Sequence, residues 1–416
     1  MVNTFYPPYH LGGDAIFVQS LSRALVSQGH QVEVVHSEDA YRLKGSSVAA
    51  ARNDPVSTMQ NDGVLVHRLR SRYSALSSIV TQQTSRPGLN ASALRRILSG
   101  PFDAVNFHNI SLVGGLEALP LSRAPVNLYT LHEHWLLCAT HTFWKNHRRP
   151  CDSPQCIRCC LRSGIPPQLW RYSGLAKRAL GSVDALLSPS AYTARRHEEA
   201  NLGRPIHVLP TYSPIDPGPL HAVPPQAQGE RARFVYVGRV TRSKGVDLLV
   251  AIFASLPQFD LDIVGDGELL ASLKRECAAS PSIHFLGSRE HSQIAQYYRG
   301  ATAMILPSLA PEVFPLCILE AFACGTPVIV SDAGGSREAV ERSGAGFVYR
   351  SDRELVDAVT MLASQSGLRA DFALRARQAY EQFYNAKRYV AEYLGLIERI
   401  QSGTMARPQV QHAAVP

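Results

Sequence analysis

No stretch of this 416-residue chain approaches the ~18 consecutive apolar residues of a membrane-spanning helix, so the sequence predicts no transmembrane segment. Charged residues are also sparse, at 18%, whereas hydrophobic residues reach 45%, which argues against extended disorder and allows a full core. Residues 1–8 show neither a charged start nor a long apolar run. We therefore find no signal peptide and expect a cytoplasmic protein.

Length and hydrophobic pattern predict an α/β protein with two doubly wound domains, because 416 residues exceed one ordinary domain. Short β-rich runs alternate with helical patterns in both halves, which is typical of parallel sheets with ligand sites at the carboxyl ends of their strands. The expected strands are 31–36, 64–68, 104–107, 126–131, 185–188, 206–210, 234–237, 261–264, 283–286, 303–306, 327–331 and 346–349. The expected helices are 15–28, 192–201, 245–256, 269–278, 292–299, 316–324, 337–342, 354–363 and 386–400.

A proline-rich segment, 211–225, marks the predicted domain boundary. The first strand, 1–5, is unusually short, so either it is clipped or the true start lies upstream. The predicted parts are an N-terminal domain 1–212 with a cysteine-rich insertion 138–160, a C-terminal domain 213–385, a helix 386–400 that packs back on the N-terminal domain, and a disordered tail 401–416.

Basic residues outnumber acidic ones by 42 to 34, and the excess lies in the first half. Residues 1–212 hold 22 Lys and Arg against 13 Asp and Glu, whereas residues 213–416 hold 20 against 21. This imbalance is either ordinary surface variation or a face for an anionic partner, such as a phosphorylated acceptor or a membrane surface. Basic residues are not interleaved with aromatics, so we expect no nucleic-acid partner.

Two carboxylates, Glu312 and Glu320, lie eight positions apart at the start of an apolar helical run. A proline-rich loop precedes Glu312, and Gly325 and Pro327 end the run. Eight residues are about two helical turns, so both acids lie on the same helix. The pair suits the two ends of one extended polar ligand.

Glycine-rich turns follow three predicted strands of the second half, and the first of them is basic. In Gly238-Arg239-Val-Thr-Arg-Ser-Lys244-Gly245, Arg239 supplies a planar fork and Lys244 a point charge that together would neutralise a diphosphate, unless the turn is simply solvated. The other two turns are Gly265-Asp266-Gly267 and Gly334-Gly335-Ser336. Each of them alone is weak evidence for a ligand site, but parallel strands bring all three turns to one edge of a sheet.

In the first half, Gly12 and Gly13 open the helix 15–28. Paired glycines there either let the backbone approach a phosphate or serve the turn for steric reasons alone. His132 ends the strand 126–131, and His108 ends the strand before it, so each is a candidate for binding or proton handling as well as for a structural role.

Five of the eight cysteines fall within 23 residues, 138–160, with the spacing C-x12-C-x4-C-x2-C. In a cytosolic protein this pattern favours a tetrahedral metal site over disulfides. We therefore expect structural zinc, with a fifth cysteine, Cys160, spare. The expected zinc ligands are Cys138, Cys151, Cys156 and Cys159.

Taken together, these residues resemble the retaining glycosyltransferase family 4, which has the GT-B fold of two Rossmann-like domains. The resemblance covers nearly the whole chain and is strongest over 234–349, where the order of motifs also matches: Gly-Arg with Lys-Gly, Val-Gly-Asp-Gly, Phe-Leu-Gly, Leu-Pro-Ser, Glu-x7-Glu and Gly-Gly. The segment from His132 through the cysteines is similar to a bacterial subgroup that builds surface polysaccharides. Glu133 departs from the family, where Asp is frequent.

The resemblance implies a UDP- or GDP-sugar donor held by the C-terminal domain and a glycan or lipid-linked acceptor held by the N-terminal one. It implies catalytic roles for Arg239 and Lys244, which stabilise the leaving diphosphate, and for Glu312 and His132, which contact the donor sugar. Glu320 would bind the ribose, and no catalytic metal is implied. The implied donor-binding residues are Gly12, Gly13, Gly238, Gly265, Asp266, Gly267, Pro315, Leu316, Glu320, Gly334 and Gly335.

Two other functions remain open on the sequence. The same fold could serve an epimerase or a phosphorylase, or a sugar-nucleotide-binding protein without catalysis. Peripheral membrane contact through the basic N-terminal domain is also expected. The sugar, the choice of uridine or guanosine, the acceptor and the linkage are not readable from the chain.

Overall fold

The computed structural model describes residues 1–10, 12–43, 56–218 and 231–404, which form two compact α/β units. Unit 1 consists of residues 1–141, 155–210 and 386 onward; unit 2 consists of residues 142–154 and 211–385. The expected α/β architecture of two doubly wound sheets is confirmed. Most of the predicted tail, from 405 on, and part of the boundary segment, 219–225, lie outside the described residues.

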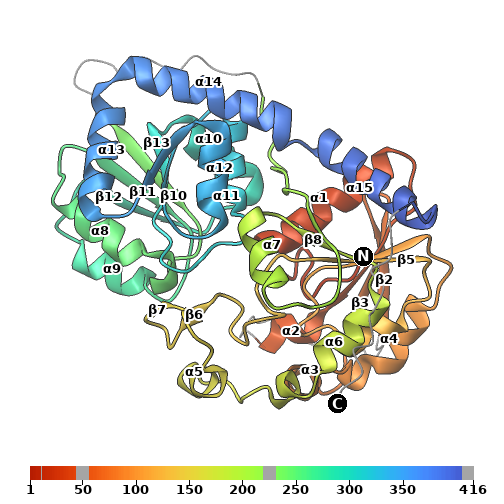
Figure 1. The fold of residues 1–416 in the computed structure, drawn as a ribbon. Coiled ribbons are helices and arrows are strands. Elements are labelled where there is room, and N and C mark those ends of the chain that lie inside the picture. Colours follow the sequence, from red (N-terminus) through yellow and green to blue (C-terminus); the bar gives the residue numbers. More distant parts are fainter. Residues whose placement is uncertain (11, 44–55, 219–230, 405–416) are drawn as a thin grey trace. The chain divides into compact units, whose positions relative to one another are not determined.

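Unit 1 is built on mostly parallel strands (Figure 1). These strands form two groups, and residues 2–4 lie between the groups and connect them. The N–H of Val2 donates to Asn106 O at 2.9 Å, and that of Asn3 donates to Val35 O at 3.0 Å, so this short segment joins β1 to β4. The strands run in the orders β1-β3-β2 and β4-β5-β8-β9. They are β1 (Glu33–Ser37), β2 (Val56–Asn61), β3 (Val64–Leu69), β4 (Ala104–Phe107), β5 (Val126–Thr130), β8 (Ala185–Ser188) and β9 (Ile206–Val208).

The C-terminal helix of the described chain packs in unit 1, against α1. The rings of Phe17 and Tyr389 meet edge to face with centroids 5.2 Å apart, which places an aromatic contact between the two helices. The helices of unit 1 are α1 (Gly13–Ser27), α2 (Glu38–Leu43), α3 (Ser74–Thr84), α4 (Ala91–Leu98), α5 (Cys156–Arg162), α6 (Leu175–Ala179), α7 (Ala191–Glu198) and α15 (Ala386–Gln401).

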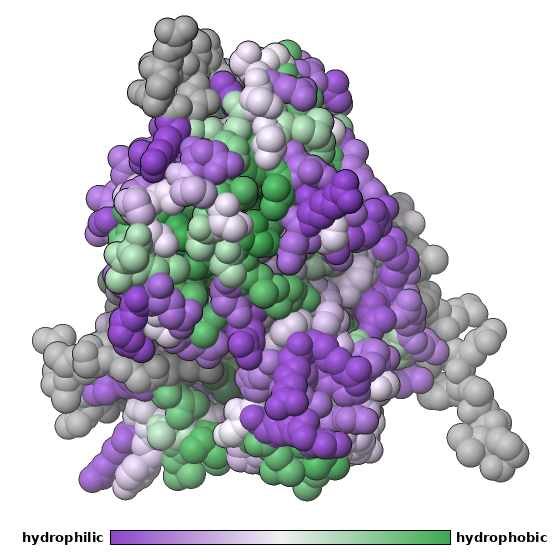
Figure 2. Space-filling model, turned by 90° about the vertical axis from the view of Figure 1, so that its left-hand side faces the viewer, coloured by the Kyte–Doolittle hydropathy of each residue, from purple (hydrophilic) through white to green (hydrophobic). Residues whose placement is uncertain are grey.

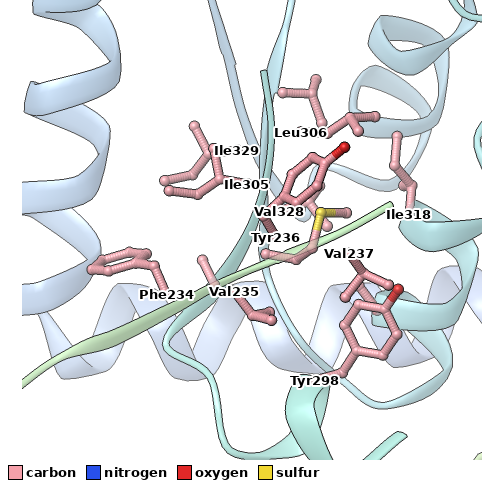
Figure 3. Close-up of a cluster of buried hydrophobic side chains, with 14 of the residues drawn as sticks. Phe234, Val235, Tyr236, Val237, Tyr298, Ile305, Leu306, Ile318, Val328 and Ile329 are labelled. Carbon is pink, nitrogen blue, oxygen red and sulfur yellow. The ribbon is translucent and has the colours of Figure 1, made fainter. Parts of the chain in front are cut away.

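Unit 2 contains a parallel sheet of six strands in the order β12-β11-β10-β13-β14-β15. Its central strands are continuous apolar runs because helices cover both faces. Figure 3 shows that core, in which the rings of Tyr236 and Tyr298 carry the only polar atoms among the labelled side chains. The strands are β10 (Arg233–Val237), β11 (Asp260–Val264), β12 (Ile283–Gly287), β13 (Ala303–Leu306), β14 (Val328–Ser331) and β15 (Gly346–Tyr349), and a separate hairpin pairs β6 (Trp144–Lys145) with β7 (Arg149–Pro150).

Helices cover the two faces of this sheet in sets, with α8, α9 and α13 on one face and α10, α11 and α12 on the other (Figure 1). A long helix, α14, packs on α11 and α12. The bounds are α8 (Val246–Ala254), α9 (Leu270–Glu276), α10 (His291–Arg299), α11 (Leu316–Ala323), α12 (Gly335–Ser343), α13 (Asp352–Ser364) and α14 (Ser366–Phe383). No helix in the described part of the chain combines the length and the apolar character that a membrane crossing requires.

Candidate functional site

The predicted donor-side turns of unit 2 lie together at the carboxyl edge of its sheet. The turn after β10 and the turn after β11 touch so closely that a Cβ on Gly265 would lie 1.8 Å from Gly238 O. Both glycines have positive φ, 146° and 155°, conformations that L side chains rarely adopt. A Cβ on Gly267 would likewise lie only 2.5 Å from Val240 O. Glycine at these positions therefore has a steric reason, and the two turns form one surface.

Lys244 and Glu312 form an ion pair at this edge, although they are 68 positions apart in the sequence. The Lys244 ammonium donates to Glu312 Oε1 at 2.5 Å, and both side chains are largely buried. The hydroxyl of Ser308, which follows β13, donates to the same oxygen. The positive φ of Gly245, with Pro307 O only 2.1 Å from its hypothetical Cβ, lets the β10 loop pack on the β13 loop.

The Gly334–Gly335 turn fixes the backbone of Glu312. Gly335 N–H donates to Glu312 O at 2.7 Å, and Glu312 N–H donates to Ala333 O at 3.3 Å. A Cβ on Gly334 would lie 2.3 Å from Glu312 O, so only glycine fits there without displacement. Glu312 and this glycine turn are therefore in direct backbone contact.

Glu320 lies deeper in α11 and is only 5% exposed. Its two oxygens have separate partners from α10: His291 Nε2 lies 2.8 Å from Oε1, and the Tyr298 hydroxyl donates to Oε2 at 2.8 Å. Burial and the nearby Glu320 charge raise the pKa of Tyr298 well above its usual value, so this phenol stays a donor. His291 and Tyr298 were not predicted as site residues, because they belong to a separate helix, α10. Their contacts with Glu320 orient its carboxylate through two partners.

Arg239 has an exposed side chain and forms no ion pair with any residue that the structure describes. Arg239 is thus a cation without an ion-pair partner, in the same turn as Lys244. Asp266 is also exposed, and its carboxylate accepts from Gly267 N–H at 2.7 Å. Pro315 and Leu316 form the start of α11, between the two acids.

Unit 1 brings together two of the histidines, at the ends of β4 and β5. His108 Nδ1 lies 2.9 Å from His132 Nε2, and the rings are stacked with centroids 5.1 Å apart. Burial lowers the pKa of His132 to about 3 and that of His108 well below its usual value. Both rings are therefore neutral at pH 7 and one donates to the other, which leaves His132 Nδ1 and the buried His108 Nε2 outside this hydrogen bond.

Gly12 and Gly13 lie at the start of α1, as expected, and both are exposed. The carboxyl that follows them, Asp14, was not singled out in the sequence. Burial and the charge of Glu133 raise its pKa to about 6, against the opposing hydrogen bonds from Ala15 N–H and from Asn109. A carboxylate oxygen of Glu133, Oε2, lies 2.7 Å from His141 Nδ1, within hydrogen-bond distance. Two carboxyl groups thus lie near the glycine turn of unit 1.

The four predicted zinc ligands are divided between the two units, so the structure does not test whether they converge. No three His, Cys, Asp or Glu side chains within the described ranges are arranged to hold a metal ion, and all eight cysteines are free thiols. Cys151 belongs to unit 2, whereas Cys138, Cys156 and Cys159 belong to unit 1. Burial, followed by the neighbouring Cys138, raises the pKa of Cys156, which favours its neutral thiol. The structure gives no support to a zinc site, and structural zinc stays a prediction for elemental analysis.

We predict that Asp14→Asn stabilises the protein more at pH 7 than at pH 4. The folded pKa of about 6 exceeds the ordinary 3.8, so ionisation of Asp14 lowers the free energy of unfolding of the wild-type protein as the pH rises from about 4 to 6 and above. Removing the ionisable group should raise the free energy of unfolding at pH 7 by on the order of 1–2 kcal/mol, allowing for partial exposure. Urea unfolding at the two pH values measures this, and an equal effect at both would contradict the raised pKa.

We also predict that position 108 sets the ionisation of His132. His108→Asn keeps a neutral donor near the place of Nδ1, whereas His108→Asp supplies an anionic acceptor that should raise the pKa of His132 above its usual 6.5. Ring-nitrogen NMR during a pH titration reports this directly. His36, another buried histidine with a pKa lowered to about 3, serves as the internal control in the same spectra. A His132 that titrates near pH 6.5 in the wild type would refute the arrangement.

Comparison with known proteins agrees with this architecture. Residues 12–211 match a family model described as "Glycosyl transferase 4-like domain", and residues 222–379 match one described as "Glycosyl transferases group 1". An O-antigen biosynthesis glycosyltransferase, WbnH, of Escherichia coli is 35% identical over 112 residues, which are 27% of this chain and 32% of that protein. The match thus spans about a third of that relative. A D-inositol 3-phosphate glycosyltransferase of Jonesia denitrificans is 26% identical over 89% of this chain and 88% of its own.

Among solved structures, sucrose-phosphate synthase from Thermosynechococcus elongatus superposes with a TM-score of 0.73 at 17% identity, over 97% of this chain and 98% of its own. The Anabaena protein HepE in complex with UDP superposes with a TM-score of 0.58 at 17% identity, over 95% and 99%. At such identities these likenesses concern the fold. Together with the two consecutive family matches, they identify the chain as a member of the glycosyltransferases of GT-B fold, with a glycosyl transferase 4-like domain followed by a group 1 domain.

Proposed function

We propose that the protein is a retaining glycosyltransferase that moves a sugar from a nucleotide diphosphate sugar to a glycan or lipid-linked acceptor. The observation that carries the proposal is the meeting of Lys244 with Glu312 beside the unpaired Arg239 at the glycine-lined edge of unit 2. Two cations there suit a diphosphate, and two oriented carboxylates suit hydroxyl groups.

The Lys244–Glu312 pair gives a physical account of donor binding. A diphosphate carries more negative charge than one carboxylate, so its arrival shifts the Lys244 ammonium from Glu312 toward phosphate oxygens. Glu312 is then released to accept from hydroxyls of the sugar, while Ser308 keeps its position. Arg239 and Lys244 stabilise the charge that develops on the leaving diphosphate, and transfer needs no metal for that purpose.

Glu320 is proposed as the ribose ligand. His291 and Tyr298 occupy one lone pair on each of its oxygens, and a carboxylate has about four acceptor sites, so two ribose hydroxyls can still donate to it. The Anabaena protein that was solved with UDP makes uridine the first donor to test. A panel of UDP- and GDP-sugars in a thermal-shift assay decides the nucleotide and the sugar.

The cellular role proposed is the assembly of surface polysaccharide at the cytoplasmic side of the membrane. The support is the partial similarity to O-antigen glycosyltransferases and the basic N-terminal half. Product analysis tests the reaction: free nucleoside diphosphate and an extended acceptor with the donor's anomeric configuration are expected. Sugar 1-phosphate would instead indicate a phosphorylase, an altered sugar an epimerase, and no release from any donor a binding protein.

We predict that Arg239→Ala and Lys244→Ala each lower kcat/KM by ~10²-fold or more, the scale of losing one transition-state donor. Nucleotide release from the best donor measures this. Arg242→Ala is the matched control. This arginine lies in the same turn and is also exposed, but it pairs with Asp247, so its loss should leave near-normal turnover. Full activity of both test variants would remove the diphosphate assignment.

A further inference from the structure

The exposed hydrophobic side chains of the protein gather in one part of unit 1. Eight of the fourteen large hydrophobic residues exposed in the described chain lie on α3, α5 and the 3-10 helices η1 (Gly88–Asn90) and η3 (Leu169–Tyr172) or directly beside them. We call the outer side of α3, η3 and α5 the basic apolar face. Large apolar groups that cluster in this way usually mark an interaction surface.

Helix α3 buries polar side chains and exposes apolar ones. Its buried residues are the small polar Ser77, Ser78 and Thr81, whereas Leu76 and Ile79 are 53% and 43% exposed. A helix that only had to pack on its own domain would bury its leucine and isoleucine and expose its serines. The orientation of α3 therefore favours an apolar partner outside the unit.

Helix α5 has the same character, with charge added. Cys159 and Cys160 are buried, while Ile157 and Leu161 are 47% and 64% exposed, one turn apart. Arg158 and Arg162 are exposed in the same two turns. Figure 2, in which the left side of Figure 1 faces the viewer, shows hydrophobic residues among hydrophilic ones at the lower end of the view, where Figure 1 draws α5.

The three elements are held together by specific contacts. Trp170 Nε1 donates to Gln82 O at 3.0 Å, which ties η3 to α3. The Cys160 thiol interacts with the backbone of Gln168, and Ile165 N–H donates to Cys160 O at 3.0 Å, which ties α5 to the segment leading into η3. The face is thus one surface and not three separate patches.

Its charge has one sign. No Asp or Glu occurs from residue 63 to 102 or from 153 to 183, whereas these segments hold eleven Lys and Arg. Arg72, Arg158 and Arg162 are exposed and form no ion pair with any residue in the described ranges. Such cations attract an anionic surface, and nothing within the face neutralises them.

We propose that the basic apolar face docks on an anionic lipid bilayer, with Leu76, Ile79, Ile157 and Leu161 entering the acyl boundary and the arginines contacting lipid headgroups. A second copy of the chain fits less well, because a two-fold interface would bring like charges together. Six of the eight protruding residues are aliphatic and only Tyr73 and Tyr172 are aromatic, whereas surfaces that bind single-stranded nucleic acid rely on stacked aromatics. The inference deepens the proposed function, but binding can be measured without turnover.

Sedimentation with vesicles of phosphatidylcholine containing phosphatidylglycerol tests the proposal. The wild-type protein should bind these vesicles, bind pure phosphatidylcholine at least tenfold more weakly, and lose affinity as salt rises. Each arginine near the surface contributes about fivefold, so the double change Arg158→Gln and Arg162→Gln should weaken binding at least tenfold. A separate double change, Leu76→Ser and Ile79→Ser, should weaken it to a similar degree.

The matched control is Arg353→Gln with Leu374→Ser, which removes one exposed arginine and one exposed leucine of unit 2 and should bind as wild type. Face variants that bind like wild type, or equal binding to both kinds of vesicle, would overturn the proposal. So would face variants that change the dimer equilibrium in sedimentation velocity but not vesicle binding, because the face would then belong to a second copy. Nucleotide release, measured in parallel, separates failure of the docking face from failure of the proposed reaction.

Discussion

The ion pair between Lys244 and Glu312 organises the candidate donor site. It connects the loop after β10 to the loop after β13, and the backbone of Glu312 in turn holds the glycine turn that starts α12. Partly buried charges are stable only when each has a partner, so the position of one loop depends on the others. The same contact places an ammonium and a carboxylate where an entering anion can exchange with the carboxylate.

The two units differ in how they treat charge. In unit 2, Lys244 and Glu312 form an ion pair, whereas Arg239 has no ion-pair partner among the described residues. In unit 1, burial lowers the pKa of His108 and of His132, which keeps both rings neutral at pH 7, and raises that of Asp14 to about 6, which leaves this carboxyl mostly ionised at pH 7. Desolvation is the largest cause in all three cases.

Much of the fold was predictable because parallel strands are apolar runs bounded by turn residues, and all twelve expected strands occur near their predicted positions. The strand β2 was missed because it is mostly exposed and shows no buried apolar pattern. The helix α14 was missed because it buries chiefly alanines, such as Ala373 and Ala376, which give no clear stripe.

The site was predictable only in part, for a related reason. Glycine turns and charged residues at strand ends are visible in the sequence, so Arg239, Lys244 and Glu312 could be singled out as candidates. Partners that come from another element are not visible: nothing near His291 indicates that it meets Glu320, and nothing near Ser308 indicates that it meets Glu312. The cysteine spacing predicted a shared ligand set, and this stays a prediction because the four cysteines are divided between the two units.

The inverted helix α3 has a consequence for the protein in water. Leucine and isoleucine on its outer side are hydrated at a cost, while serine and threonine fill the space beneath them. Exposed apolar side chains of this kind favour self-association, so we expect detergent or lipid to cover the same side chains during purification.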